Sequence, residues 1–288
     1  MDIAEHPVGI NSRVSELSNK LSWTVSSDVM YVGIWGMGGV GKTTLAKAIF
    51  NQISPNFDGS SFLHVGSQDS RGNSSLIVLQ EKLLKDTLRK RIEVSSVDHG
   101  IELIKQRLQS KRVLIILDDV ADVEEIYSLV GGKHWFGPGS RIIITTRDEH
   151  LLKCSTSDVK YEVKCMTESE SLQLFCWHAF KNPLPPEDFV EISETVVTHA
   201  KGLPLALKVW GSFLCNKSME QVKCIIKNLK QIPHNSIVET LRRSYDGLPD
   251  DAKKVFLDIA CFFEGRTRKM FLKSSAVAVS SLKSELMS

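Results

Sequence analysis

Nine consecutive residues, 36–44, carry the clearest chemistry in the chain. They read GMGGVGKTT and match G-x-x-x-x-G-K-[ST], with Gly36, Gly41, Lys42 and Thr43 at the required positions. Glycines in such a loop let successive backbone N–H groups point at a phosphate. Lys42 would reach the β- and γ-phosphates of a nucleotide, and the Thr43 hydroxyl would bind magnesium. The other loop residues expected at the phosphates are Gly38, Gly39, Val40 and Thr44.

The residues on either side of this loop have the composition of a strand and a helix. Met30–Trp35 is expected to be a buried strand, and residues 45–50 are expected to continue into a helix. This order places a helix N-terminus, with its partial positive charge, at the phosphate. The alternative is a glycine-rich turn without a ligand, which the order of the elements argues against.

A second candidate site follows the apolar run at residues 112–117. Five consecutive branched aliphatic residues are typical of a central parallel strand that is covered on both faces. The run ends in Asp118 and Asp119, at the strand end where open α/β sheets bind ligands. Asp118 would hold magnesium, directly or through water, and Asp119 would orient or deprotonate an attacking water. The alternative is a solvated turn at the end of the strand.

Residues 140–148 repeat this design, with a β-branched strand that ends in polar residues. Arg147 could contact a γ-phosphate, because its planar guanidinium suits phosphate oxygens. The alternative is an arginine paired with Asp148 or with a helix end.

Composition limits the classes of partner. The 288 residues include 36 Lys and Arg against 34 Asp and Glu, a net charge of +2, which gives no overall basic field. No apolar run approaches the roughly 18 residues of a spanning helix, and the first residues lack the order of a secretory signal. The six cysteines lie far apart, as is typical of reduced thiols in the cytosol. We therefore expect an intracellular protein without a membrane span and without direct nucleic-acid binding.

Beyond residue 165 the pattern becomes helical. Thr167 and Glu170 match a capping box that opens a helix. Gly202 can end another helix in the left-handed conformation, and Pro204 fits the first turn of the next. The apolar corner at residues 202–206 could fold back on the α/β unit and close over an adenine ring.

The ordered set of motifs resembles the nucleotide-binding switch module, NB-ARC, of plant disease-resistance receptors with leucine-rich repeats. The form of residues 256–263, and the absence of tryptophan after Val120, resemble the subclass with a Toll/interleukin-receptor-like N-terminal domain. The segments that carry the resemblance are 36–44, 114–120, 139–148, 161–180, 202–206 and 256–263.

This resemblance implies an ADP- or ATP-operated switch in innate immune signalling, with Mg²⁺ as cofactor and slow ATP hydrolysis. It implies that Asp119 serves hydrolysis and that Arg147 senses the γ-phosphate. It also places Val8, Gly9, Arg13 and Pro204 at the nucleotide, around the adenine. Other receptor chains, or a second copy, are the implied protein partners, and the cytoplasm, with the nucleus as an alternative, is the implied compartment.

The fold class expected is α/β: a P-loop NTPase with a three-layer parallel sheet, followed by a helical subdomain and an incomplete winged-helix region. We expect a linker at 1–25, a nucleotide-binding domain at 26–164 and a helical subdomain at 165–235. A truncated winged-helix subdomain is expected to start at 236–265, before a divergent tail at 266–288. The family's signalling domain, its Met-His-Asp motif and its repeats have no counterpart in the sequence.

Two other functions remain open from the sequence. A phosphate-loop kinase or metabolic ATPase would need an arginine-bearing lid and a second substrate pocket, and no segment suggests either. A truncated interaction fragment, an adaptor or decoy for full-length receptors, would use the apolar helical residues at 240–265 to associate with them.

Overall fold

The computed structural model describes residues 1–21, 28–66, 73–154, 157–218 and 220–222. All of them fall within one compact unit, Met1–Val238. The segments expected to form a winged-helix start at 236–265 and a tail at 266–288 lie outside the described residues, as do residues 223–235 of the expected helical subdomain.

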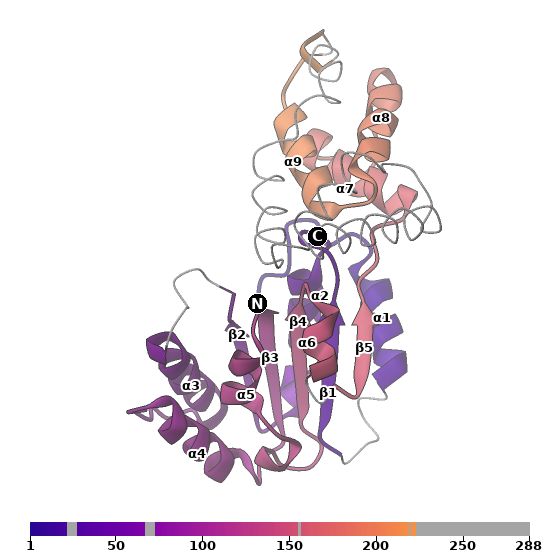
Figure 1. Cartoon of the computed structure of the whole chain (residues 1–288). Helices are drawn as coiled ribbons and strands as arrows, with labels where there is room; N and C mark the ends of the chain where they lie inside the picture. Colours follow the sequence, from indigo (N-terminus) through magenta and orange to yellow (C-terminus); the bar gives the residue numbers. More distant parts are fainter. Residues whose placement is uncertain (22–27, 67–72, 155–156, 219, 223–288) are drawn as a thin grey trace, which may run out of the picture. The chain divides into compact units, whose positions relative to one another are not determined.

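A five-stranded parallel sheet forms the centre of this unit (Figure 1). Its strands lie in the order β2-β3-β4-β1-β5. The strands are β1 Met30–Trp35, β2 Gly59–His64, β3 Val113–Val120, β4 Arg141–Thr146 and β5 Val159–Glu162. The expected strands at the phosphate loop, before the two acids and before Arg147 are therefore present.

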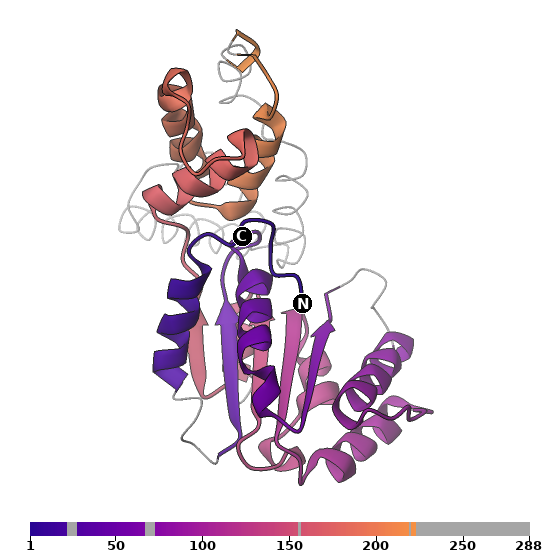
Figure 2. The same ribbon diagram turned by 180° about the vertical axis from the view of Figure 1, so that it is seen from behind.

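Helices cover both faces of the sheet, as Figures 1 and 2 show from opposite sides. One face packs against α1 Ile10–Leu21 and α2 Lys42–Ile53, which is followed by the short 3-10 helix η1 Ser54–Asn56. The other face packs against α3 Asn73–Leu88, α4 Val97–Leu108, α5 Val123–Val130 and α6 Glu149–Cys154, with the 3-10 helix η3 Lys133–Trp135 after α5. The expected three-layer α/β fold is confirmed.

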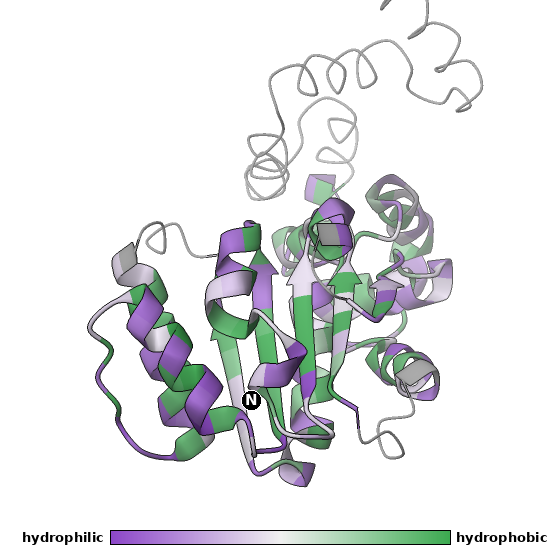
Figure 3. Ribbon diagram, turned by 60° about the horizontal axis from the view of Figure 1, so that its bottom comes forward, coloured by the Kyte–Doolittle hydropathy of each residue, from purple (hydrophilic) through white to green (hydrophobic). Residues whose placement is uncertain are grey.

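Burial explains why the strands have continuous apolar runs. Each residue from Val113 to Leu117 in β3 is fully buried, and successive side chains enter the two cores alternately. The hydropathy colouring of Figure 3 shows the strands largely apolar, whereas the helices combine apolar and hydrophilic positions. The sheet is therefore held between two hydrophobic layers.

Helix α1 was not expected from the sequence, because it lies in the segment assigned as a linker. Its apolar residues Ile10, Val14 and Leu17 recur at helical spacing and are buried in the same core as α2. Strands β2 and β5 were also not assigned from the sequence.

Three helices follow the sheet: α7 Glu168–Phe180, α8 Val190–Ala200, preceded by the 3-10 helix η4 Glu187–Phe189, and α9 Pro204–Leu214. The expected capping box of α7 is confirmed, since Thr167 and Glu170 each bond the other's backbone N–H. Gly202, with φ 73°, follows α8, and Pro204 occupies the first turn of α9 as expected. This corner directs the start of α9 toward the phosphate loop.

The strand order decides where chemistry can occur. Strand β4 lies between β1 and β3, and all of these strands run parallel. Their carboxyl ends therefore meet at one edge of the sheet, which brings together the residues that follow Trp35, Leu117 and Thr146.

Candidate functional site

The expected phosphate loop connects β1 to α2. Helix α2 begins at Lys42, and Gly41 precedes it with φ 102°, in the region that favours glycine. Gly39 has φ 79°, and a side chain there would place its Cβ 2.7 Å from the Cβ of Leu205 in α9. The backbone N–H of Leu205 also donates to the Gly39 carbonyl, at 3.2 Å. The loop is thus held by α2 on one side and by α9 on the other.

Lys42 is the charged centre of the loop. Its side chain is buried, and Nζ donates to the carbonyl oxygens of Gly36 at 2.8 Å and Met37 at 3.0 Å. Burial, aided by the nearby positive charge of Arg147, lowers the pKa of Lys42 to about 8. An ammonium group in this setting would be stabilised by an additional negative partner.

Asp118 organises the end of β3. The side chain is fully buried, and its two oxygens accept from Thr43 Oγ1, each at 3.0 Å. Thr145 Oγ1 of β4 donates to the same carboxylate at 2.7 Å, and His64 Nδ1 lies 3.0 Å from Oδ2. Thr43 and Asp118, the two residues predicted for magnesium, are therefore in direct contact, and their oxygens are of the type that Mg²⁺ prefers.

Asp119 and Arg147 form an ion pair that the sequence did not predict. Arg147 Nε lies 3.1 Å from Asp119 Oδ1, and a second guanidinium nitrogen lies 3.2 Å from Oδ2. The alternatives considered above for Arg147 were a pair with Asp148 and a contact with a helix end. These two bonds go to neither of them. Both paired residues are partly buried at the cavity described next.

The backbone explains how Asp119 reaches this partner. Asp119 has φ 59°, an uncommon conformation for a residue other than glycine, and the β3–β4 register shifts between Leu117 and Val120. The Asp119 N–H donates to Thr145 Oγ1 at 2.8 Å, which holds the irregular strand end in place. This break in the strand lets Asp118 and Asp119 serve different neighbours.

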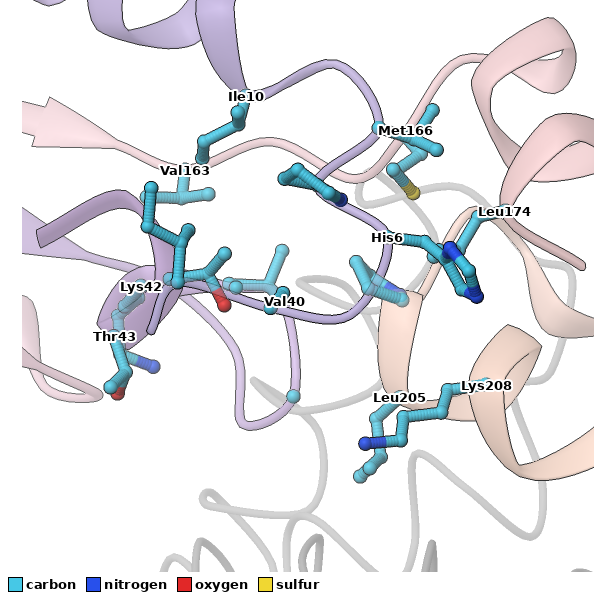
Figure 4. A pocket seen from close by; sticks show the side chains of 18 of the residues that line it. His6, Ile10, Val40, Lys42, Thr43, Val163, Met166, Leu174, Leu205 and Lys208 are labelled. Carbon is cyan, nitrogen blue, oxygen red and sulfur yellow. The ribbon is translucent and has the colours of Figure 1, made fainter. Parts of the chain in front are cut away.

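A cavity of about 400 Å³ lies above the phosphate loop, in the size range of small-molecule sites (Figure 4). Many of the predicted site residues line it: Val8, Arg13, Gly38, Gly39, Val40, Gly41, Lys42, Thr43, Thr44, Asp119, Arg147 and Pro204. Gly9, Gly36 and Asp118 are not in direct contact with the cavity. Gly9 separates two lining residues, Gly36 binds Lys42 through its carbonyl, and Asp118 lies behind Thr43.

Gly9 and Arg13 have a visible structural role at this cavity. Arg13 forms a two-point ion pair with Glu170, at 2.8 and 2.9 Å, and it donates to the Gly9 carbonyl. This pair holds the pKa of Glu170 below its usual value, chiefly through the Arg13 hydrogen bond. A side chain on Gly9, whose φ is 68°, would overlap the Glu170 carboxylate. The contact therefore joins the start of α1 to the start of α7 beside the cavity.

Sequence reasoning missed a further group of lining residues. They are Ile3, Ala4, Glu5, His6, Pro7, Ile10, Val163, Met166, Leu174, His178, Leu205 and Lys208. Val163, Met166, Leu174 and His178 lie in the segment 161–180, and Leu205 lies in the corner 202–206, but none of them was named as a site residue. Assigning β5 from the alternation at Val159–Glu162 would have drawn attention to Val163 and Met166, which follow the strand end. No sequence signal links the first seven residues to α7.

Among the helices that the structure describes, none is both long enough and apolar enough to cross a membrane.

Comparisons with known proteins agree with this geometry. Disease resistance protein RPV1 of Vitis rotundifolia is 43% identical over 275 residues, which are 95% of this chain and 20% of that protein. TMV resistance protein N of Nicotiana glutinosa is 42% identical over 273 residues, which are 92% of this chain and 23% of that protein. The chain thus spans about a fifth of the length of these relatives.

The fold also resembles a solved structure, Cdc6p from Pyrobaculum aerophilum. The TM-score is 0.53 at 12% sequence identity, covering 72% of this chain and 61% of that one, which supports the fold alone. Residues 10–185, more than half of the chain, match the NB-ARC domain. The chain belongs to the NB-ARC domain family.

Proposed function

We propose that this chain is the nucleotide-binding module of a plant immune receptor, and that it binds ADP or ATP with Mg²⁺ as a molecular switch. One observation carries the proposal. Lys42, Thr43 and Arg147 line a single cavity above a glycine loop that opens a helix, and Asp118 lies directly behind Thr43.

The phosphate loop fits the phosphates of a nucleotide. Lys42 is buried at a cost to its charged form, so a phosphate beside it would recover part of that cost. A Cβ added at Gly41 would meet no atom within 4 Å, so the loop is open at the start of α2. Backbone N–H groups at this helix N-terminus supply the remaining donors.

Thr43 and Asp118 fit a magnesium site. When bound, Mg²⁺ would neutralise phosphate charge. Thr145 and His64 also contact the Asp118 carboxylate, so its orientation is fixed before any ion arrives.

The apolar part of the cavity wall fits the face of an aromatic ring such as adenine. Val8 from the N-terminal segment and Pro204 from α9 contribute to it, together with the apolar residues Val163 and Met166 that follow β5. The wall therefore depends on both the sheet and the helical segment. A change of nucleotide could in this way affect how the two are held together.

The Asp119–Arg147 pair supports slow rather than fast hydrolysis. Asp119 is our candidate for orienting the attacking water, yet its carboxylate is occupied by Arg147. Arg147 is in turn our candidate for contacting the γ-phosphate. The ion pair restrains both groups and uses part of their hydrogen-bonding capacity. We therefore expect ATP turnover below roughly 1 s⁻¹, the low end of enzyme rates.

The biological part of the proposal rests on the relatives. Those described above are named as resistance proteins. By extension, we place this module in a receptor of the Toll/interleukin-receptor-like subclass, acting in the cytoplasm or the nucleus. Its partners would be other receptor chains or a second copy.

Nucleotide binding tests the proposal directly. We expect ADP and ATP to bind the purified chain, ATP in a Mg²⁺-dependent manner. Lys42→Ala should lose about 2–5 kcal/mol of binding free energy, at least tenfold in affinity, because it removes a charge partner of the phosphates. Unchanged affinity in this variant would overturn the proposal.

The same binding experiment distinguishes the proposed nucleotide switch from the alternative function, an interaction fragment. A folded chain that binds no nucleotide, but associates with full-length receptor chains, would be an interaction fragment. The residues on which that alternative depends, 240–265, lie outside those described.

A further inference from the structure

Three side chains that commonly bind metals meet at a part of the cavity wall away from the phosphate loop. Glu5 and His6 belong to the segment before α1, and His178 lies in the last turn of α7. Each offers one donor atom, and the three atoms lie within 4.8 Å of one another. We infer that Glu5, His6 and His178 form a binding site for a divalent transition-metal ion of the zinc type.

The distances suit such an ion. A tetrahedral zinc site with bonds of about 2.0–2.1 Å separates neighbouring donor atoms by roughly 3.4 Å. His6 Nε2 lies 3.6 Å from one Glu5 oxygen, and His178 Nδ1 lies 4.0 Å from the other. Because the three donor atoms lie within 4.8 Å of one another, shifts of roughly 1 Å, in the exposed Glu5 side chain and between the two imidazoles, would bring them onto one ion. Two imidazoles and one carboxylate leave a fourth position for water, as in many zinc sites.

The His6 ring supplies an independent sign that a partner belongs here. His6 Nε2 is buried and has no hydrogen-bond partner among the described residues. The ring is nevertheless fixed: it stacks on Trp177, with centroids 5.1 Å apart at 14°, and meets the edge of His178 at 4.9 Å. Figure 4 shows His6 among the side chains that line the cavity. A buried nitrogen without a partner is costly, and a metal ion would satisfy it.

Lys181 competes for the same carboxylate. Its Nζ lies 3.5 Å from Glu5 Oε1, but both side chains are about 60% exposed. Exposed ion pairs of this kind are weak, so a metal ion can displace the ammonium group. The ion would then tie the N-terminal segment to α7 across one wall of the cavity.

Zinc binding to the full-length, tag-free chain tests the site. The measurement is competition with a chromophoric zinc chelator, in the absence of nucleotide. We expect one Zn²⁺ per chain, with affinity at least about tenfold lower in Glu5→Gln and in His6→Asn, since loss of a ligand should cost at least as much as loss of its supporting contacts. His199→Asn, an exposed histidine on α8, is the matched control and should bind as the wild type does.

The cluster at Asp118 offers another place where zinc could bind, so His64→Asn is a necessary comparison. Loss of zinc binding in His64→Asn, with full binding in Glu5→Gln and His6→Asn, would overturn the inference. X-ray absorption of the zinc-loaded chain should show two imidazoles at about 2.0 Å. A zinc ion without imidazole ligands would equally overturn it. Neither result depends on whether the chain binds nucleotide.

Discussion

Replacing Lys42 with methionine should stabilise the nucleotide-free protein while it weakens nucleotide binding. Methionine keeps the aliphatic stem and removes the buried ammonium group. In the folded protein the pKa of Lys42 is lowered from 10.5 to about 8. One pKa unit corresponds to about 1.36 kcal/mol, so keeping Lys42 charged costs the folded protein about 3 kcal/mol at neutral pH. The variant also loses the bonds to the Gly36 and Met37 carbonyls, which water in the cavity can replace. We expect a net gain of about 1–3 kcal/mol.

The pH dependence of this gain has a definite sign. Below pH 8 Lys42 is charged in both the folded and the unfolded chain, so the wild type bears the full cost. Above its unfolded pKa of 10.5 the residue is neutral in both states, and the cost vanishes. The stability difference between Lys42→Met and the wild type should therefore shrink as the pH rises from 8 to 10.5.

Urea unfolding of nucleotide-stripped protein measures this difference. Lys85→Met, which changes an exposed lysine on α3, is the matched control and should alter stability by less than about 0.5 kcal/mol. Addition of ADP should stabilise the wild type and leave Lys42→Met unchanged. A Lys42→Met protein that is less stable than the wild type at pH 7, or that ADP stabilises equally, would refute the reasoning.

Three further predictions follow from contacts around the cavity. Asp119→Asn should reduce ATP turnover to the background rate, because it removes the candidate water-orienting carboxylate, while ADP should still bind. Phosphate release measures the turnover, and equilibrium binding measures the affinity for ADP. Undiminished turnover would contradict the role assigned to Asp119. Glu170→Gln keeps a residue that can serve the capping box but loses the ion pair with Arg13, so unfolding free energy should fall by about 1–3 kcal/mol at pH 7. Because Arg13 lowers the Glu170 pKa, this difference should fade as the pH falls below 4.5, as acid-dependent urea unfolding would show; a constant difference would count against it. Gly39→Ala should lower the unfolding free energy by about 1–3 kcal/mol, because the new Cβ would lie 2.7 Å from Leu205 of α9 and the residue would have to keep a φ of 79°. Urea unfolding measures this change as well, and an unchanged stability would argue against the contact.

The parts of the fold that depend on local patterns could be predicted from the sequence. β1, β3 and β4 have long apolar runs, and the helix caps follow from the residue types at Thr167 and Gly202. β5 has only four residues, with a single buried side chain at Tyr161, so its pattern is too short to separate from a loop. α1 shows helical spacing at Ile10, Val14 and Leu17, but it has no acidic residue in its first turn to mark its start.

The same distinction holds for the candidate site: the positions of some of its residues could be predicted from local patterns, and those of others could not. The positions of Lys42, Thr43 and Asp118 follow from strand ends that a parallel sheet must bring together. The Asp119–Arg147 pair could not be predicted, because it depends on a shift of the β3–β4 register and on a positive φ at Asp119. Both properties arise from tertiary packing.

The contact between the N-terminal segment and α7 also lay beyond sequence reasoning. His6 and His178 are far apart in the chain and belong to no shared motif. They meet where the N-terminal segment packs against α7, a contact that includes the Arg13–Glu170 ion pair and the stacking of His6 on Trp177.

Identification of the resident nucleotide tests the central claim most directly. Freshly purified full-length chain would be denatured, and the released small molecules separated and identified by mass. The account predicts ADP or ATP in the wild type and neither in Lys42→Ala prepared in parallel. A well-folded wild-type chain that releases no adenine nucleotide, and that binds neither ADP nor ATP when these are added with Mg²⁺, would contradict it.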